Sequence, residues 1–128
     1  VSESGKPESA IVYFVFDEFF NIFFMTRTES RKYKNLESNP HASFVVYAEH
    51  PPKTVQLEGV VEMVIDADER IKHFNKLVEI SVDGNFIPPV SQLENGKMAF
   101  MKMKTKWARF SDFEITKEGD RFIETRTL

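Results

Sequence analysis

Residues 22–40 read IFFMTRTESRKYKNLESNP, an apolar segment that passes directly into a basic one. The first five residues are aromatic, apolar or β-branched, which predicts a strand over 22–26. The segment 30–37 predicts one or two helical turns, because Ser30 is a suitable N-cap and Pro40 ends the pattern. A strand that leads into the N-terminus of a helix brings free backbone N–H groups and partial positive charge to one place.

The predicted helix opens with basic side chains, although the whole chain has a net charge of −3. Arg31 can bind a phosphate group through two parallel hydrogen bonds, and Lys32 adds a compact positive charge. The hydroxyl groups of Thr26 and Ser30 add neutral donors. These residues fit a phosphate-binding site, but they also fit a solvated helix face with local Glu–Lys pairs. The basic residues of this stretch are Arg27, Arg31, Lys32 and Lys34.

The rest of the chain predicts a mainly β protein. The apolar run 10–16 predicts a strand buried on both faces, joined to the strand 22–26 by a hairpin turn. A helix is predicted over 66–78, with Asp66 as its N-cap. Because the strands are joined by hairpin-type connections and do not alternate regularly with helices, we expect an antiparallel barrel with Greek-key character, made of about six strands and two helices. The other predicted segments are strands at 42–49, 54–65, 98–105 and 108–113, a loop at 81–96, and a turn at 117–120 that allows one more short hairpin.

Two features interrupt this pattern. Gly59 lies inside the strand 54–65 and predicts a bulge or a sharp bend. Phe19 and Phe20 lie at the tip of the first hairpin, where side chains are normally polar. They fit either a contact with a second subunit or a fold back onto the chain's own core.

Lysine alternates with other residues over 101–107, MKMKTKW. In a strand this alternation places the lysines on one face, which predicts an edge strand protected against aggregation. The same alternation predicts that Trp107 and Arg109 share a face with Met103, where they could border a flat ligand.

The composition excludes several kinds of chemistry. The 128 residues fit a single domain spanning 1–128, and the absence of cysteine excludes disulfides, thiolate metal sites and a cysteine nucleophile. The net charge of −3 argues against a nucleic-acid partner, and no apolar run approaches the ~20 residues of a membrane span. The five glycines are scattered, so no phosphate-cradling loop is predicted. The sequence also predicts no catalytic residue. A bound cofactor would therefore supply any difficult chemistry. The three histidines lack metal-ligand spacing and are expected to be surface or capping residues: His41, His50 and His73.

The order of these motifs resembles the FMN-binding split-barrel family of pyridoxamine 5′-phosphate oxidase. The resemblance covers residues 4–65 well and the remainder in outline. It implies a six-stranded antiparallel split barrel that forms a homodimer with FMN at the subunit interface. The residues that carry it are Ser4-Gly5-Lys6-Pro7, Thr26, Ser30-Arg31-Lys32, Asn35-Leu36, Asn39-Pro40 and Glu58-Gly59.

The resemblance also implies where the cofactor would bind. The flavin ring would lie along the first strand, at Val12 and Tyr13. Thr54, at the start of the fourth strand, would reach the ring, and Trp107 of the other subunit would complete the site. The phosphate would be held by Thr26, Ser30, Arg31 and Lys32.

The chain departs from the oxidase itself in two places. That enzyme carries an Arg and a Lys on the first strand, whereas the matching positions here are Ser9 or Ala10 and Phe14 or Val15. It also carries Arg-x-His near its C-terminus, and the nearest match here, 109–111, has no His. We therefore do not expect oxidation of vitamin B6. The family normally begins with a helix and the first half of the first strand, which we expect to be missing from this chain.

Two functions follow as expectations. The first is an FMN-dependent oxidoreductase of the cytoplasm that acts on a small-molecule substrate of unknown identity. The second is a non-enzymatic binding or stress-response protein on the same barrel, which binds haem, a deazaflavin or no cofactor.

Overall fold

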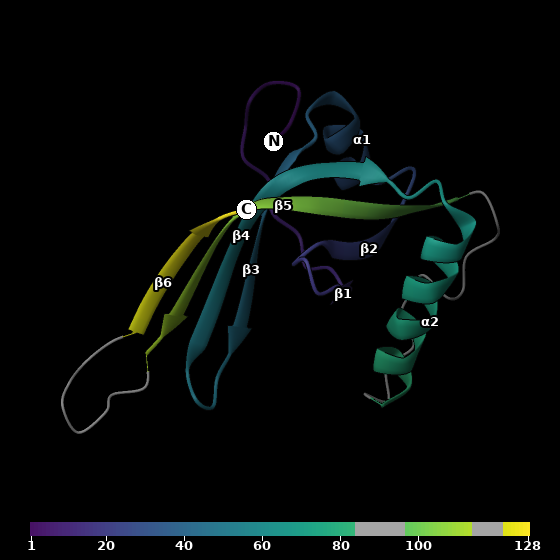
Figure 1. Ribbon diagram of the computed structural model, residues 1–128. Coiled ribbons are helices and arrows are strands. Elements are labelled where there is room, and N and C mark those ends of the chain that lie inside the picture. Colours follow the sequence, from purple (N-terminus) through teal and green to yellow (C-terminus); the bar gives the residue numbers. More distant parts are fainter. Residues whose placement is uncertain (84–96, 114–121) are drawn as a thin grey trace.

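The computed structural model describes residues 1–83, 97–113 and 122–128 and is mainly β. Six antiparallel strands form one sheet in the order β1-β2-β5-β4-β3, and β6 pairs with the second half of β5 (Figure 1). Within the described ranges β1 and β3 do not pair, so the sheet is curved but not closed. The predicted class of six antiparallel strands with two helices is confirmed. The strands are β1 (Phe14–Phe16), β2 (Ile22–Arg27), β3 (His41–Ala48), β4 (Lys53–Met63), β5 (Met98–Asp112) and β6 (Phe122–Thr127), and the helices are α1 (Arg31–Ser38) and α2 (Ala67–Asp83).

Strand β2 lies at the centre of the core because it is buried on both faces. Ile22, Phe23 and Phe24 are each 2% exposed or less. On one face Phe24 packs with Met103 of β5, and on the other face Phe23 packs with Leu77 of α2. Complete burial of a side chain of this size contributes about 1.5–3 kcal/mol. The alternation along β2 therefore places the core shared with β4 and β5 on one face of the sheet and α2 on the other.

A β-bulge divides the pair formed by β4 and β5. Gly59 lies opposite Thr105, but its neighbour Glu58 lies opposite Trp107, so the register shifts at this point. A Cβ atom on Gly59 would lie 2.1 Å from the carbonyl oxygen of Lys104, which is closer than real Cβ contacts. Only glycine permits the two backbones to approach this closely. The predicted bulge at Gly59 is confirmed.

The bulge decides which side chains share a face of β5. Lys106 is the extra residue, and beyond it the alternation is inverted. Trp107 therefore lies on the face opposite to Met103, together with Glu58 of β4. The prediction that Trp107 and Arg109 share a face with Met103 is wrong for this reason. The two strands predicted over 98–113 are one continuous strand of 15 residues.

Strand β5 is central, so the prediction of an edge strand from its lysines is wrong. It pairs with β2, β4 and β6. The Nζ atom of Lys102 lies 2.7 Å from a carboxylate oxygen of Glu69 on α2. The Nζ atom of Lys104 lies 3.0 Å from a carboxylate oxygen of Glu62 on β4. These lysines balance acidic neighbours and do not protect an edge.

Strand β1 is shorter and more exposed than predicted. Only Phe14–Phe16 pair with β2, and Ile11 is 94% exposed. The prediction of a strand over 10–16 buried on both faces is wrong, because β1 is at the sheet edge and one strand adjoins it. At the hairpin tip Phe19 and Phe20 are 69% and 44% exposed, so they do not fold back onto the chain's own core.

Helix α2 begins where the sequence predicts. The N–H group of Glu69 donates to the carboxylate of Asp66 at 3.2 Å, as expected for an N-cap. The helix continues past the predicted end at 78 to Asp83. The last strand, β6, pairs antiparallel with β5, as expected if the C-terminal segment adds one more strand. The remainder of the predicted loop, 84–96, and the turn at 117–120 lie outside the described residues.

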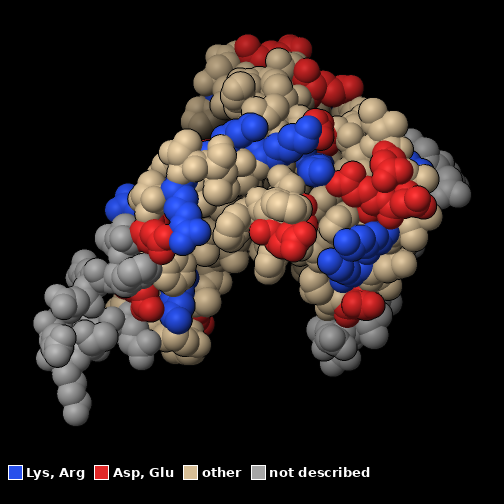
Figure 2. All heavy atoms as spheres, in the orientation of Figure 1, with Lys and Arg blue, Asp and Glu red and all other residues tan. Residues whose placement is uncertain are grey.

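The molecule has the shape of an arch. One arm contains β3, β4, β6 and the adjoining half of β5, and the other arm contains α2 (Figure 1). Figure 2 shows that the surface is hollowed between the two arms. Val45 and Tyr47 of β3 are 68% and 63% exposed, and the register places them on the same face as Trp107. Exposed apolar side chains that gather on one face are typical of a protein–protein contact.

Candidate functional site

The candidate phosphate site lies where β2 ends and α1 begins. Thr26 is 3% exposed, and its Oγ1 lies 3.0 Å from Oγ of Ser30. The Ser30 hydroxyl accepts from the N–H group of Tyr33 at 3.2 Å and donates to the carbonyl of Arg27 at 2.7 Å. Ser30 is therefore the N-cap of α1, as the sequence predicts. These hydrogen bonds hold the turn between the strand and the helix in one geometry.

The same turn is anchored to the central strands. The N–H group of Thr28 donates to the carbonyl of Lys97 at 2.9 Å, and the Thr28 hydroxyl donates to the same oxygen at 3.4 Å. Lys97 directly precedes β5, so the start of α1 keeps a fixed place beside β2 and β5.

Helix α1 begins with a basic and hydrogen-bond-donating surface. Its first turn contains Arg31, Lys32 and Lys34 and no acidic residue. The first N–H groups of a helix lie outside its own hydrogen-bond ladder and favour an anion. The donor set at this junction therefore fits a phosphate group.

An anionic group of the chain itself already binds α1. The carboxylate of Glu8 accepts a hydrogen bond from the guanidinium of Arg31 and another from Nδ2 of Asn35 at 2.6 Å. These two hydrogen bonds, that of Arg31 first, hold the pKa of Glu8 below its ordinary value of 4.5. The Arg31 side chain is 81% exposed, so this contact is a surface ion pair that an anion from solution can replace. Sequence reasoning misses Glu8, because an acid at 8 and a base at 31 form no local pattern.

The structure separates the predicted phosphate residues from two of the predicted ring residues. Thr26 lies opposite Ala99 of β5, whereas Thr54 lies opposite Ser111, twelve residues further along that strand. At roughly 3.3 Å per residue this separation is about 40 Å along the strand. Trp107 also lies on the far half of β5. One copy of the chain therefore brings Thr26, Ser30, Arg31 and Lys32 together, but not Thr54 or Trp107.

Val12 and Tyr13 lie directly before β1, next to the end of β2. The pairing of Phe14 with Phe24 sets this position. Val12 packs against the core, whereas Tyr13 is 46% exposed. Of these two predicted ring residues, Tyr13 is the one whose side chain offers surface to a ligand.

His73 is buried on α2, so its predicted surface or capping position is wrong. It is 3% exposed, and its ring stacks on Phe23 with 3.6 Å between the centroids. Its Nδ1 has no hydrogen-bond partner among the residues that the structure describes. Burial, followed by the charges of Lys76 and Lys72, lowers the pKa of His73 below its ordinary value of 6.5. A neutral imidazole packs as an aromatic ring, which accounts for its place in the core.

The other histidines, His41 and His50, are exposed as predicted. Over 1–83, 97–113 and 122–128, no group of three or more His, Asp or Glu is arranged to hold a metal ion. None of the helices in these ranges has both the length and the apolar character to cross a membrane.

Sequence comparison identifies relatives of this chain. A family model described as pyridoxamine 5′-phosphate oxidase matches residues 1–112. The pyridoxine/pyridoxamine 5′-phosphate oxidase of Bordetella pertussis is 34% identical over 68 residues, which are 53% of this chain and 32% of that protein. The chain therefore spans about a third (32%) of the length of this curated relative.

Solved structures share the fold at low sequence identity. A heme binding protein from Mycobacterium smegmatis has a TM-score of 0.75 at 14% identity, over 99% of this chain and 50% of that one. A pyridoxamine 5′-phosphate oxidase-related, FMN binding protein from Nostoc punctiforme has a TM-score of 0.61 at 13% identity, over 100% of this chain and 84% of that one. At these identities the likeness shows the split-barrel fold alone.

Proposed function

The chain belongs to the pyridoxamine 5′-phosphate oxidase family, and we propose that it binds FMN with the phosphate at the junction of β2 and α1. The observation that carries this proposal is the fixed turn from Thr26 to Ser30, which is followed directly by Arg31 and Lys32. The FMN-binding structure from Nostoc punctiforme, which shares the fold, supports the choice of cofactor. When bound, FMN supplies electron transfer at its ring.

Each residue at the junction has a separate part in this proposal. The Ser30 hydroxyl is already used by Tyr33 and Arg27, so Ser30 positions the turn and does not bind the phosphate directly. Arg31 can offer two parallel hydrogen bonds and Lys32 a point charge. Arg31 already binds the carboxylate of Glu8, an oxyanion as a phosphate group is. FMN binding therefore requires Glu8 to release Arg31.

We further propose that a second copy of the chain completes the ring side of the site. Val12 and Tyr13 lie beside the phosphate end, whereas Thr54 and Trp107 lie on the far half of the β4–β5 pair. A homodimer in which the far arm of one copy covers the junction of the other would bring the two groups together. The exposed apolar side chains on the same face as Trp107 support such a contact.

The activity that this site supports best is an FMN-dependent oxidation or reduction of a small molecule. Oxidation of vitamin B6 is not proposed, because this chain has no basic residue at the positions that match the Arg and the Lys on the first strand of the oxidase. Ser9 and Ala10 precede β1, and Phe14 and Val15 both pack against the core.

The phosphate site is tested by titrating the apoprotein with FMN and following quenching of flavin fluorescence. The double variant Arg31→Ala with Lys32→Ala removes both charged ligands. Each charge-assisted hydrogen bond contributes about 1.5 kcal/mol even at the low end, so FMN affinity should fall about 100-fold. Lys34→Ala, which removes a charge from the same exposed turn, is the matched control and should change affinity less than about threefold. Equal affinity of the double variant and the wild type would place the phosphate elsewhere.

A second candidate function is haem binding without turnover. The observation in its favour is the TM-score of 0.75 to the heme binding protein from Mycobacterium smegmatis. Titration of the apoprotein with haemin separates the two candidates. A shifted haem absorption band without FMN uptake favours this second function, and FMN uptake without a haem spectrum excludes it.

A further inference from the structure

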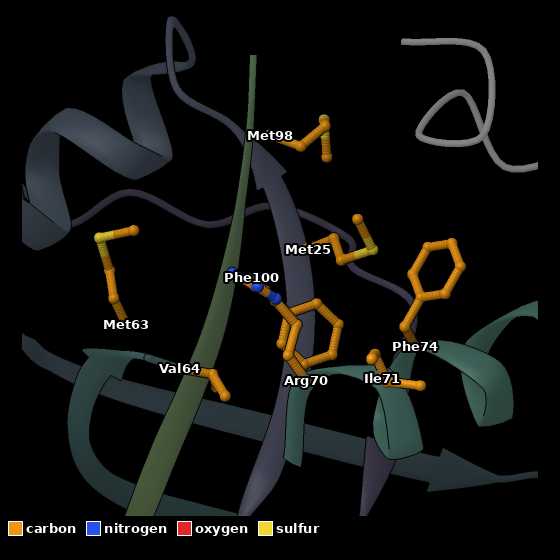
Figure 3. A pocket seen from close by; sticks show the side chains of 8 residues that line it. All are labelled: Met25, Met63, Val64, Arg70, Ile71, Phe74, Met98 and Phe100. Carbon is orange, nitrogen blue, oxygen red and sulfur yellow. The ribbon is translucent and has the colours of Figure 1, made fainter. Parts of the chain in front are cut away.

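A cavity of about 290 Å³ lies on the α2 side of the sheet, away from the phosphate junction. Met25 and Phe100 form its floor on β2 and β5, and they pair with each other across these strands. Thr26 is the next residue after Met25, so its side chain lies on the opposite face. The cavity is therefore separate from the site proposed for FMN. Its lining is Met25, Met63, Val64, Arg70, Ile71, Phe74, Met98 and Phe100 (Figure 3).

Seven of these eight residues are apolar, and several are more exposed than core residues are. Met63, Ile71 and Phe74 are 51%, 57% and 40% exposed. The three methionines have flexible thioether side chains that adapt to the shape of a ligand. The volume is close to the lower end of small-molecule sites, roughly 300–1,000 Å³. The cavity thus suits the apolar body of a small ligand.

Arg70 is the charged residue among the eight that line the cavity. Figure 3 shows its side chain extending from α2 toward the sheet, across the cavity. Its guanidinium forms no ion pair with any residue in the described ranges. Its neighbour Glu69 is bound to Lys102 instead. A guanidinium that forms no ion pair within these ranges and lies beside an apolar surface is complementary to an apolar ligand with one anionic end.

We propose that this cavity binds a small amphipathic monocarboxylate, with its apolar body against the methionines and its carboxylate on Arg70. This site does not depend on FMN. A neutral analogue would keep the apolar contacts and lose the charged hydrogen bonds, so the carboxylate should bind about tenfold more tightly.

Decanoate and decan-1-ol are the probes, and methyl-labelled methionine provides the signal. The chain has five methionines, of which Met25, Met63 and Met98 line the cavity. Met101 and Met103 are buried in the core and are internal controls. Decanoate should shift the methyl resonances of the three lining methionines and leave those of the two core methionines in place. Equal shifts at all five, or none, would overturn the proposal.

The charge is tested by Arg70→Gln, with Lys72→Gln on the same helix as the control. Arg70→Gln should remove the preference for decanoate over decan-1-ol, and Lys72→Gln should keep it. An unchanged preference in Arg70→Gln would overturn the assignment of the carboxylate. Decanoate binding that disappears as the protein associates at high concentration would show that a second copy of the chain is the occupant, which also overturns it.

Discussion

Replacing Gly59 by alanine should destabilise the sheet strongly, although it adds a single methyl group. The new Cβ atom would lie 2.1 Å from the carbonyl oxygen of Lys104 and 2.8 Å from its carbonyl carbon. Ordinary van der Waals contact begins at 3.4 Å, so the oxygen must move by more than 1 Å. Both atoms belong to the backbone of β5, which is paired on either side, so no side chain can rotate away.

The size of the effect follows from this geometry. Overpacking costs about 1–3 kcal/mol, and separating the strands weakens neighbouring ladder hydrogen bonds at about 1 kcal/mol each. A total of about 3–4 kcal/mol is a large part of the ~5–15 kcal/mol that stabilises a typical domain. For a chain of this size Tm should fall by about 10–20 °C.

Thermal unfolding by circular dichroism, with urea unfolding as a second measurement, gives this change. Glu58→Ala is the matched control, because the side chain of this neighbour is exposed and its backbone has room for a Cβ. The control should lower Tm by less than about 3 °C. If Gly59→Ala behaves like Glu58→Ala, the close approach at the bulge is wrong. If it yields no folded protein while the control folds, the expected direction is confirmed.

Three further perturbations test the junction and the core. Ser30→Ala removes the N-cap of α1 and should cost about 1 kcal/mol, measured by urea unfolding. Glu8→Gln should tighten FMN binding severalfold, because it removes the carboxylate that binds Arg31. Glu3→Gln is its control and should leave the affinity unchanged, because the Glu3 carboxylate accepts a hydrogen bond from Ser38, at the other end of α1. Because the pKa of His73 is lowered in the folded protein, the unfolded chain binds more protons as the pH falls below 6.5. The stability that the buried His73 ring contributes is therefore present above pH 6.5 and is lost as the pH falls toward the folded-state pKa. Urea unfolding between about pH 8 and about pH 5 should show this loss in the wild type but not in His73→Phe, and an equal slope in both would contradict it.

The elements around residues 22–40 could be predicted because they depend on near neighbours. A run of aromatic and β-branched residues predicts β2, and Ser30 and Tyr33 are three positions apart in the chain. The bulge at Gly59 could be predicted as well, since a glycine inside a long strand has few other uses. The family resemblance then suggested Thr26, Ser30, Arg31 and Lys32 as the residues that would hold the phosphate, and the structure places these four residues together where β2 ends and α1 begins.

The features that could not be predicted depend on contacts far apart in the sequence. The exposure of β1 follows from its place at the sheet edge, which its own composition does not reveal. Trp107 lies on the opposite face from Met103 because one extra residue, Lys106, enters the bulge. His73 is buried because Phe23, fifty residues earlier, provides a ring on which it stacks. The contact of Glu8 with Arg31 depends on the path of the N-terminal segment along α1.

The most direct test of the phosphate site compares FMN with riboflavin, which has the same ring and no phosphate. Both are titrated into the wild-type apoprotein under identical conditions, with fluorescence quenching as the signal. Two charge-assisted contacts predict that FMN binds about 100-fold more tightly than riboflavin. Equal affinities for the two flavins, or no binding of either, would contradict a phosphate site at the start of α1.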